Sequence, residues 1–153
     1  PSENKRLDLA IKISNVKNIK LRVIGWKKTD FNRIYYKKNY SMENIEFLGA
    51  LEHLAAIEEL KSSAGLLALS EREAMPLTIV EALLVGIPIY TRDQSGYRFF
   101  INNFDTVKKI SCDKEPIEKP NVYRLRLNQK KASGLFCKLS YKKYFVGIIN
   151  KYL

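Results

Sequence analysis

The stretch that decides the fold is GLLALSEREAMPLTIVEALLVGIPIY, residues 65–90. Its apolar opening, 65–69, is typical of a strand that is buried on both faces of a parallel sheet. A helix is expected over residues 77–85, because Pro76 lies just inside its start and Gly86 just past its end. The short apolar run 87–90 is the next expected strand. The order of strand, helix and strand predicts a pair of parallel strands with a helical crossover.

The same alternation continues outward in both directions from this stretch. We expect further strands at residues 21–26, 45–48 and 107–111. Helices are expected over residues 6–16, 31–40, 52–62, 97–102 and 139–153, with a linker at 113–121. The predicted fold class is therefore α/β, a Rossmann-like doubly wound parallel sheet, in which ligands bind beyond the carboxyl ends of the strands.

Composition excludes several kinds of protein. The chain has 153 residues, of which 46% are hydrophobic and 28% are charged, as in a single globular domain. Two cysteines, Cys112 and Cys137, and one histidine, His53, argue against a disulfide framework, a zinc site and a histidine-based triad. His53 is expected to be a surface or capping residue. No run reaches the roughly 18 apolar residues of a membrane span, so we expect a soluble, cytoplasmic protein without a signal peptide.

The net charge of +11 is unevenly distributed. Residues 1–43 carry +7 and residues 106–153 carry +9, whereas the central residues 44–105 carry −5. Two basic ends favour contact with a polyanion, either nucleic acid or an anionic membrane surface. A solvated, lysine-rich surface explains the same charge equally well.

The loop between the strand at 65–69 and the helix at 77–85 carries the candidate chemistry. Glu73 precedes the helix and Glu81 lies about one turn inside it. A helix N-terminus offers unpaired N–H groups to a phosphate, and a carboxylate accepts hydrogen bonds from neighbouring hydroxyls of a sugar or ribose. The pattern thus indicates a ligand with anionic and polyhydroxyl parts. Alternatively, Glu73 only complements the helix dipole and Glu81 is an ordinary surface residue.

Residues 4–96 closely resemble the C-terminal, donor-binding domain of the family 4, GT-B-fold retaining glycosyltransferases of group 1. The family's signature is a Glu, seven residues, a Glu-Ala pair and a Gly-x-Pro turn into a strand. Here it is formed by Glu73, Glu81-Ala82 and Gly86-Ile87-Pro88. The segments NIEFLG (44–49) and NKRLDLA (4–10) match the family in order and spacing. The resemblance implies one Rossmann-like half of a GT-B fold.

The resemblance also implies roles for individual residues. Glu73, the proposed catalytic residue, would hold the donor sugar, and Glu81 would bind the ribose hydroxyls. Lys5 would pair with the diphosphate. The backbone after Glu73 would hold the donor, and the end of the second strand would face the nucleobase; these positions are Ala74, Met75, Pro76, Leu77, Leu48 and Gly49. The implied reaction moves a sugar from a nucleotide diphosphate to an acceptor with retention, and it needs no metal or other cofactor.

Two departures from the family's pattern bear on this interpretation. The usual pair of glycines after the fourth strand is Ser95-Gly96 here, and no acidic residue is evident at 97–99. A complete enzyme of this class has a second domain that binds the acceptor, so we expect this chain to be the donor half. We divide it into a nucleotide-sugar-binding domain, 1–112, and a linker with a C-terminal helical extension, 113–153, packed on that domain.

Two other functions stay open at this point. A basic nucleic-acid-binding protein would suit the charge and the lysine-tyrosine mixture at 33–38, but the chain has none of the common nucleic-acid-binding motifs. An inactive GT-B-like interaction module would need a degraded motif, whereas Glu73, Glu81 and the turn at 86–88 are intact. We therefore predict a donor-binding glycosyltransferase domain whose basic ends also associate with the membrane periphery.

Overall fold

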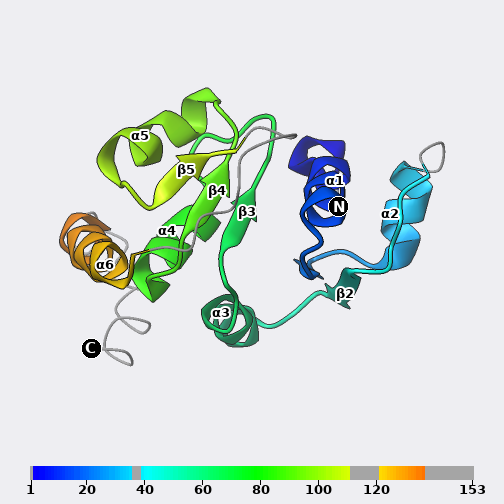
Figure 1. Ribbon diagram of the computed structural model, residues 1–153, viewed down its shortest axis with the longest axis horizontal. Helices are drawn as coiled ribbons and strands as arrows, with labels where there is room; N and C mark the ends of the chain where they lie inside the picture. Colours follow the sequence, from blue (N-terminus) through cyan, green and yellow to red (C-terminus); the bar gives the residue numbers. More distant parts are fainter. Residues whose placement is uncertain (1, 36–38, 111–120, 137–153) are drawn as a thin grey trace.

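Helices alternate with strands along the chain in the computed structural model, which describes residues 2–35, 39–110 and 121–136 (Figure 1). The predicted helix at 139–153, both cysteines and nearly all of the predicted linker lie outside these residues. None of the described helices is long and apolar enough to cross a membrane. In chain order the elements are η1 (Glu3–Lys5), α1 (Leu7–Lys17), β1 (Leu21–Ile24), α2 (Lys28–Ile34), β2 (Ile45–Gly49), α3 (His53–Lys61), β3 (Leu66–Ala68), α4 (Leu77–Val85), β4 (Ile89–Thr91), α5 (Ser95–Asn103), β5 (Val107–Lys109) and α6 (Val122–Phe136).

All the strands pair in parallel, as the alternating pattern predicts, but they form two sheets. β1 pairs with β2, with Leu21 opposite Ile45. The second sheet has the order β3-β4-β5, and Ile89 at its centre lies opposite both Leu66 and Val107. Among the described residues no strand joins β1 to β3. The parallel α/β class is thus confirmed, with the sheet divided at that position.

Two hydrophobic clusters cover the sheets. One gathers α1, α2 and β1 and includes Leu67 and Leu69 from β3 and its following residue. The other gathers α4 and α5 with Ile57 of α3 and Ala68 of β3, and it extends to α6. Successive side chains of a strand point to opposite faces, so the two faces of β3 belong to different clusters. Helices therefore cover both faces of the fold, as in a doubly wound architecture.

The helix at the centre of the deciding stretch has the predicted bounds. α4 begins after Pro76 and ends before Gly86, whose φ of +84° is a left-handed conformation that favours glycine. The Gln129 side chain donates to the carbonyl of Leu84 at 2.7 Å and so satisfies one of the last acceptors of the helix. The strand that follows, predicted at 87–90, lies slightly later.

Two helices depart from the sequence-based expectation. The helix predicted at 31–40 is α2, at 28–34, and it begins three residues earlier, where the Asp30 carboxylate accepts the N–H of Lys27 at 3.2 Å. The helix α6 was not predicted at all. Its buried residues are Asn128, Ala132 and Phe136, while Leu127 and Tyr123 are exposed. The apolar pattern that would indicate this helix is therefore weakened by a polar residue on its buried face and by apolar residues on its exposed face.

Candidate functional site

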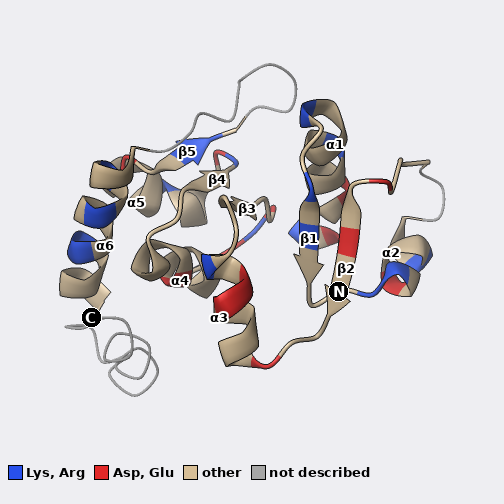
Figure 2. Ribbon diagram, turned by 60° about the horizontal axis from the view of Figure 1, so that its bottom comes forward, with Lys and Arg blue, Asp and Glu red and all other residues tan. Residues whose placement is uncertain are grey.

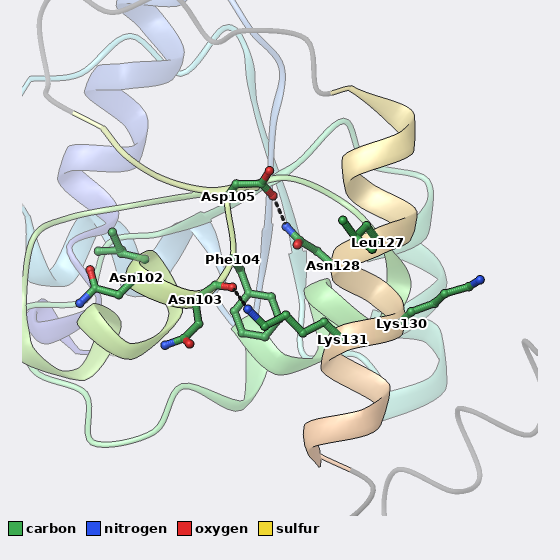
Figure 3. Close-up of a pocket in the computed structure, with 9 residues that line it drawn as sticks. Asn102, Asn103, Phe104, Asp105, Leu127, Asn128, Lys130 and Lys131 are labelled. Atoms are coloured by element: carbon green, nitrogen blue, oxygen red, sulfur yellow. Dashed lines mark hydrogen bonds between the residues drawn. The ribbon is translucent and has the colours of Figure 1, made fainter.

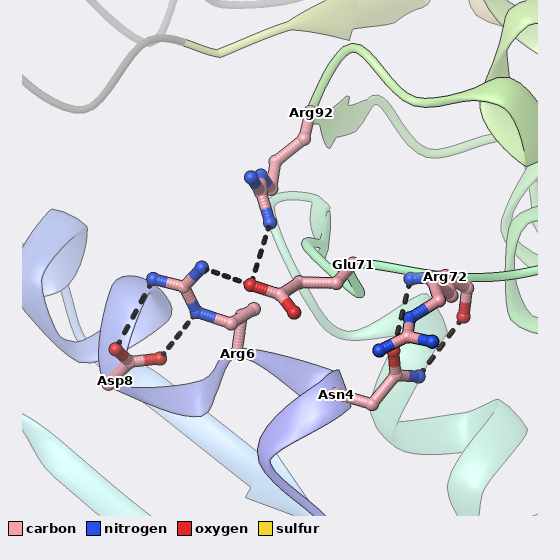
Figure 4. Close-up of polar contacts among 6 residues, drawn as sticks. All are labelled: Asn4, Arg6, Asp8, Glu71, Arg72 and Arg92. Atoms are coloured by element: carbon pink, nitrogen blue, oxygen red, sulfur yellow. Dashed lines mark hydrogen bonds and ion pairs between the residues drawn. The ribbon is translucent and has the colours of Figure 1, made fainter.

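Two segments meet beyond the carboxyl end of β3. The N-terminal residues before α1 lie against the loop that joins β3 to α4 (Figure 4). The Asn4 carbonyl accepts the N–H of Glu71 at 2.8 Å. The Asn4 side chain donates to the carbonyl of Arg72 and accepts its N–H, both at 3.0 Å. Asn4 therefore fixes the N-terminal segment to this loop through three hydrogen bonds.

The contact between Lys5 and Glu73 is the central feature of the site. The Lys5 ammonium donates to Glu73 Oε1 in an ion pair. The Lys5 side chain is 52% exposed, whereas that of Glu73 is 20% exposed. Two residues that the sequence predicted as diphosphate and sugar ligands, 68 positions apart, are thus brought into contact.

The carboxyl group of Glu73 is held in its ionised form. Burial would raise its pKa, but hydrogen bonds from Lys5 and Ser70 outweigh burial and hold the pKa below its usual value. Ser70 is itself buried, and its side chain also hydrogen-bonds the phenol of Tyr97. An ionised carboxylate offers only acceptors, which suit the O–H donors of sugar hydroxyls.

Glu81 lies in a drier environment than Glu73. Its side chain, in α4, is 17% exposed, and burial raises the pKa of its carboxyl group. The charge of His53, at the start of α3, partly opposes that rise, with His53 Nδ1 3.9 Å from Glu81 Oε1. His53 is half-exposed, as expected, but no sequence signal indicated that it faces Glu81.

A group of charged residues beside this site was also missed by sequence reasoning. Arg6 donates to Asp8 Oδ1 at 3.0 Å and to Glu71 Oε1 at 2.6 Å (Figure 4). Arg92, after β4, lies 3.9 Å from the same Glu71 oxygen. The contacts with Asp8, and then with Glu71, raise the pKa of the Arg6 guanidinium above its usual value. Arg6 has a left-handed φ of +49°, and its contacts join α1 to the β3–α4 loop.

The remaining predicted site residues fall into two groups. Ala74, Met75 and Leu77 are exposed and Pro76 is buried, in the segment that leads into α4. The first N–H with an intrahelical partner in α4 is that of Ile79, which donates to the Pro76 carbonyl at 3.0 Å, so the preceding amides at the helix start are the ones available to a ligand.

Leu48 and Gly49 form the second group, at the end of β2. Gly49 has a left-handed φ of +69°, and its carbonyl accepts the N–H of Gly25 at 2.6 Å. This contact ties the carboxyl ends of β1 and β2 together. Both residues therefore lie at the carboxyl edge of the two-stranded sheet, and that they face a nucleobase stays a prediction.

The pocket in Figure 3 belongs to the opposite end of the three-stranded sheet. It is lined by the end of α5, by the two residues after it and by α6, where Asn128 donates to Asp105 at 2.6 Å and Lys131 to the Asn103 carbonyl at 2.6 Å. Phe104 and Asp105 come shortly before β5, so the pocket lies at the amino end of that strand. The pocket is thus separate from the group around Glu73.

Taken together, the site combines a cation, an ionised carboxylate and a helix N-terminus. Lys5 and the start of α4 suit an anionic group, because both present positive charge or unpaired donors. Glu73 and Glu81 supply acceptors for hydroxyl groups. Among the described residues, no group of three or more histidine, cysteine, aspartate or glutamate side chains is arranged to hold a metal ion.

Solved structures similar to this chain include two glycosyltransferases and one complex. AviGT4, a glycosyltransferase involved in avilamycin A biosynthesis, matches 90% of this chain and 47% of its own, with a TM-score of 0.63 and 17% identity. WaaG, a glycosyltransferase involved in lipopolysaccharide biosynthesis, matches 84% of this chain and 34% of its own, with a TM-score of 0.57 and 21% identity. The GtfA/B complex matches 100% of this chain and 31% of its own, with a TM-score of 0.54 and 16% identity.

These likenesses show the fold, which is one Rossmann-like half of a GT-B architecture. The chain spans less than half the length of each of these relatives. A search of curated proteins found no match. The family model for glycosyl transferases group 1 matches residues 2–119, most of the chain. The chain therefore belongs to the group 1 glycosyltransferase family.

Proposed function

We propose that this chain is the donor-binding half of a retaining glycosyltransferase that takes a sugar from a nucleotide-diphosphate sugar. The observation that carries the proposal is the contact of Lys5 with Glu73 beside the N-terminus of α4. Lys5 and the helix amides, at the carboxyl end of a parallel strand, suit the diphosphate of such a donor. The Glu73 carboxylate suits the hydroxyl groups of its sugar. A separate domain would bind the acceptor.

In this proposal Lys5 and the start of α4 bind the diphosphate. Cleavage of the bond between sugar and diphosphate leaves negative charge on the diphosphate oxygens. A positioned ammonium and the amide of Leu77 stabilise that charge as it develops, and they need no metal ion to do so. Lys5 is half-exposed, so its side chain is free to turn from Glu73 to a phosphate at little cost.

Glu73 and Glu81 bind hydroxyl groups in this proposal. Glu73 is ionised and accepts hydrogen bonds from the donor sugar, which orients the sugar for transfer. Glu81, which is more deeply buried, accepts from the ribose hydroxyls. Hydrogen bonds to a carboxylate in such a dry site are strong, so losing Glu81 has a large effect on nucleotide affinity.

Calorimetric titration of the chain with uridine, guanosine and adenosine diphosphates tests the proposal. We expect one of them to bind, and Glu81→Gln to weaken that binding about 10- to 100-fold, the loss of 1.5–3 kcal/mol of hydrogen bonding to a charged group. Glu46→Gln, on β2, serves as the matched control and leaves the affinity unchanged.

A nucleotide that lacks the ribose hydroxyls separates the role of Glu81 from a general defect. The wild-type chain and Glu81→Gln are expected to bind the 2′,3′-dideoxy diphosphate equally weakly. Absence of binding by all three diphosphates to a folded sample would contradict the proposal. Undiminished binding in EDTA is expected, whereas a requirement for Mg²⁺ would contradict the metal-free role of Lys5.

We also propose that the chain contacts an anionic membrane surface through α6. Tyr123 and Leu127 are 73% and 53% exposed, and the same helix carries basic residues (Figure 2). These are Arg124, Arg126, Lys130 and Lys131. A helix face that combines exposed aromatic and aliphatic side chains with basic residues suits the interface of an anionic bilayer.

A further inference from the structure

Tyr97, in the first turn of α5, is a buried tyrosine whose ring and hydroxyl group have different partners. The residue is 1% exposed, and its ring belongs to the hydrophobic cluster that contains Ile79 and Leu83 of α4. Its hydroxyl group lies beyond the carboxyl end of β3, where it hydrogen-bonds the side chain and the backbone of Ser70. Because the ring is packed in the core, the position of the hydroxyl group is fixed.

Ser70 links this tyrosine to the Glu73 carboxylate. Ser70 is buried, and its side chain hydrogen-bonds both the carboxylate and the phenol of Tyr97. A serine hydroxyl has one hydrogen and an ionised carboxylate can only accept, so Ser70 donates to Glu73. The Tyr97 hydroxyl therefore donates to Ser70 Oγ. The three side chains form a hydrogen-bonded chain from the core to the site.

The direction of the Ser70 hydroxyl depends on its second partner. A serine side chain has three staggered positions, and nearby backbone carbonyls compete for its hydrogen. A donor on Ser70 Oγ favours the position that points to Glu73, because hydrogen bonds in a chain polarise and strengthen one another. Of the described titratable residues, Lys5 from η1 and Tyr97 from α5 face Glu73. Lys5 is half-exposed, whereas the link through Ser70 is buried.

We propose that Tyr97 is a positioning residue, which directs the Ser70 hydroxyl at Glu73 and so holds the carboxylate in the orientation that accepts hydroxyl groups of the donor sugar. Tyr97 itself is buried and acts through Ser70. When Lys5 turns to a phosphate, Ser70 still donates to Glu73. The role in sugar binding rests on the proposed function, whereas the hydrogen-bonded chain does not.

The first test is Tyr97→Phe, which keeps the ring and removes the donor. Carboxyl NMR signals should show a higher pKa for Glu73, because burial still raises it and the weakened bond from Ser70 opposes burial less. Tyr90→Phe is the matched control. Tyr90 is also buried, but its ring lies 3.1 Å from a Cβ placed at Gly65, before β3, so the pKa of Glu73 should not change.

The same titration in a Ser70→Ala background separates positioning from a merely structural role. There the link is already broken, so adding Tyr97→Phe should leave the pKa of Glu73 where Ser70→Ala alone puts it. An unchanged Glu73 pKa in folded Tyr97→Phe would overturn the proposal. So would an equal rise with and without Ser70.

Calorimetry with the nucleoside diphosphate that binds, and with its glucose ester, tests the role in sugar binding. Tyr97→Phe should weaken binding of the glucose ester about 3- to 10-fold, as expected for one hydrogen bond, and leave the affinity for the diphosphate unchanged. Equal weakening of both ligands would overturn this role. If the wild type binds neither ligand, the proposed function fails, and the titration of Glu73 still decides whether Tyr97 acts on it.

The wild-type chain provides a further measurement if Tyr97→Phe fails to fold. The NMR signal of the ring carbon that bears the Tyr97 hydroxyl should shift as Glu73 takes up its proton in acid, because Ser70 then loses its charged acceptor. The corresponding signal of Tyr90 should not follow that titration. A Tyr97 signal that stays constant while Glu73 titrates would overturn the proposal.

Discussion

A Cβ atom at Gly96 would lie 1.8 Å from the carbonyl oxygen of Glu73, so the first turn of α5 packs directly against the backbone of the β3–α4 loop. The side chain of Gln94 caps the same turn by accepting the N–H of Gly96 at 2.8 Å. The position of Glu73 therefore depends on a glycine 23 residues later in the chain, on a different helix.

Replacing Gly96 by alanine is expected to destabilise the protein by about 1–3 kcal/mol, because a methyl group and a backbone carbonyl cannot share this space. Urea unfolding measures the change. Gly134→Ala is the matched control, since a Cβ there meets no atom within 4 Å and α6 gains helix propensity. Equal stability of the two variants would show that the Glu73 loop does not need the close approach of α5.

The ion pair of Lys5 with Glu73 predicts a specific titration. In Lys5→Met the pKa of Glu73 should rise, because burial still opposes the charged form and one of the two opposing hydrogen bonds is gone. Carboxyl NMR signals of Glu73 report this directly. In the wild type, the ionised Glu73 carboxylate stabilises the fold at pH values above its unfolded pKa. This contribution is lost as the pH falls through the lower folded pKa, so the stabilities of wild type and Lys5→Met converge in acid.

The expected loss of stability in Lys5→Met at neutral pH is less than about 1 kcal/mol, as is typical of half-exposed ion pairs. Lys20→Met is the matched control. It removes the 2.7 Å pair of Lys20 with Glu46 and should leave the titration of Glu73 unchanged. A Glu73 pKa that is the same in Lys5→Met and wild type would mean that the pair is absent in solution.

Glu81 should affect stability with the opposite sign. Burial raises its folded pKa above the unfolded value, so its stabilising contribution is full below the unfolded pKa and is lost as pH rises through the folded pKa. Glu81→Gln removes the cost of a buried charge. We therefore expect this variant to be more stable than wild type at pH 7 and to have similar stability at low pH, as measured by thermal unfolding.

Glu46→Gln is the control for Glu81→Gln, because the pKa of Glu46 is lowered by Lys20 rather than raised by burial. This exposed carboxylate contributes at neutral pH and loses its contribution as pH falls, so its replacement should not stabilise the protein. A Glu81→Gln variant less stable than wild type at pH 7 would mean that His53 outweighs burial at this position.

A helix or strand of this fold can be predicted from the sequence when its buried face is apolar. α4 was predicted with its bounds because Pro76 and Gly86 mark its ends and its residues are mostly apolar. α6 was missed because polar residues make part of its contact with the rest of the fold: Asn128 donates to Thr106, and Gln129 to the end of α4. A polar interface of this kind becomes visible only when both partners are in place.

The candidate site divides in the same way. The sequence identified Lys5 and Glu73 as members of one site, and the fold brings them into contact. It did not indicate the pairing of His53 with Glu81 or of Arg6 with Glu71, because single charged residues show no periodicity that would relate one segment to another. Such contacts follow from the meeting of strand ends and depend on the complete fold.

Membrane association through α6 predicts binding to anionic vesicles that depends on salt. Each basic residue near an anionic surface contributes about 1 kcal/mol, so reversing Arg126 and Lys130 to glutamate should weaken binding by tenfold or more in co-sedimentation. Reversing Lys12 and Lys28, on α1 and α2, changes the net charge equally and should have a smaller effect.

Tyr123→Ser with Leu127→Ser should reduce the binding that persists at high salt, where charge attraction is screened. Equal losses from the two charge reversals would assign the binding to overall charge rather than to α6, and equal binding to neutral vesicles would exclude an electrostatic contribution.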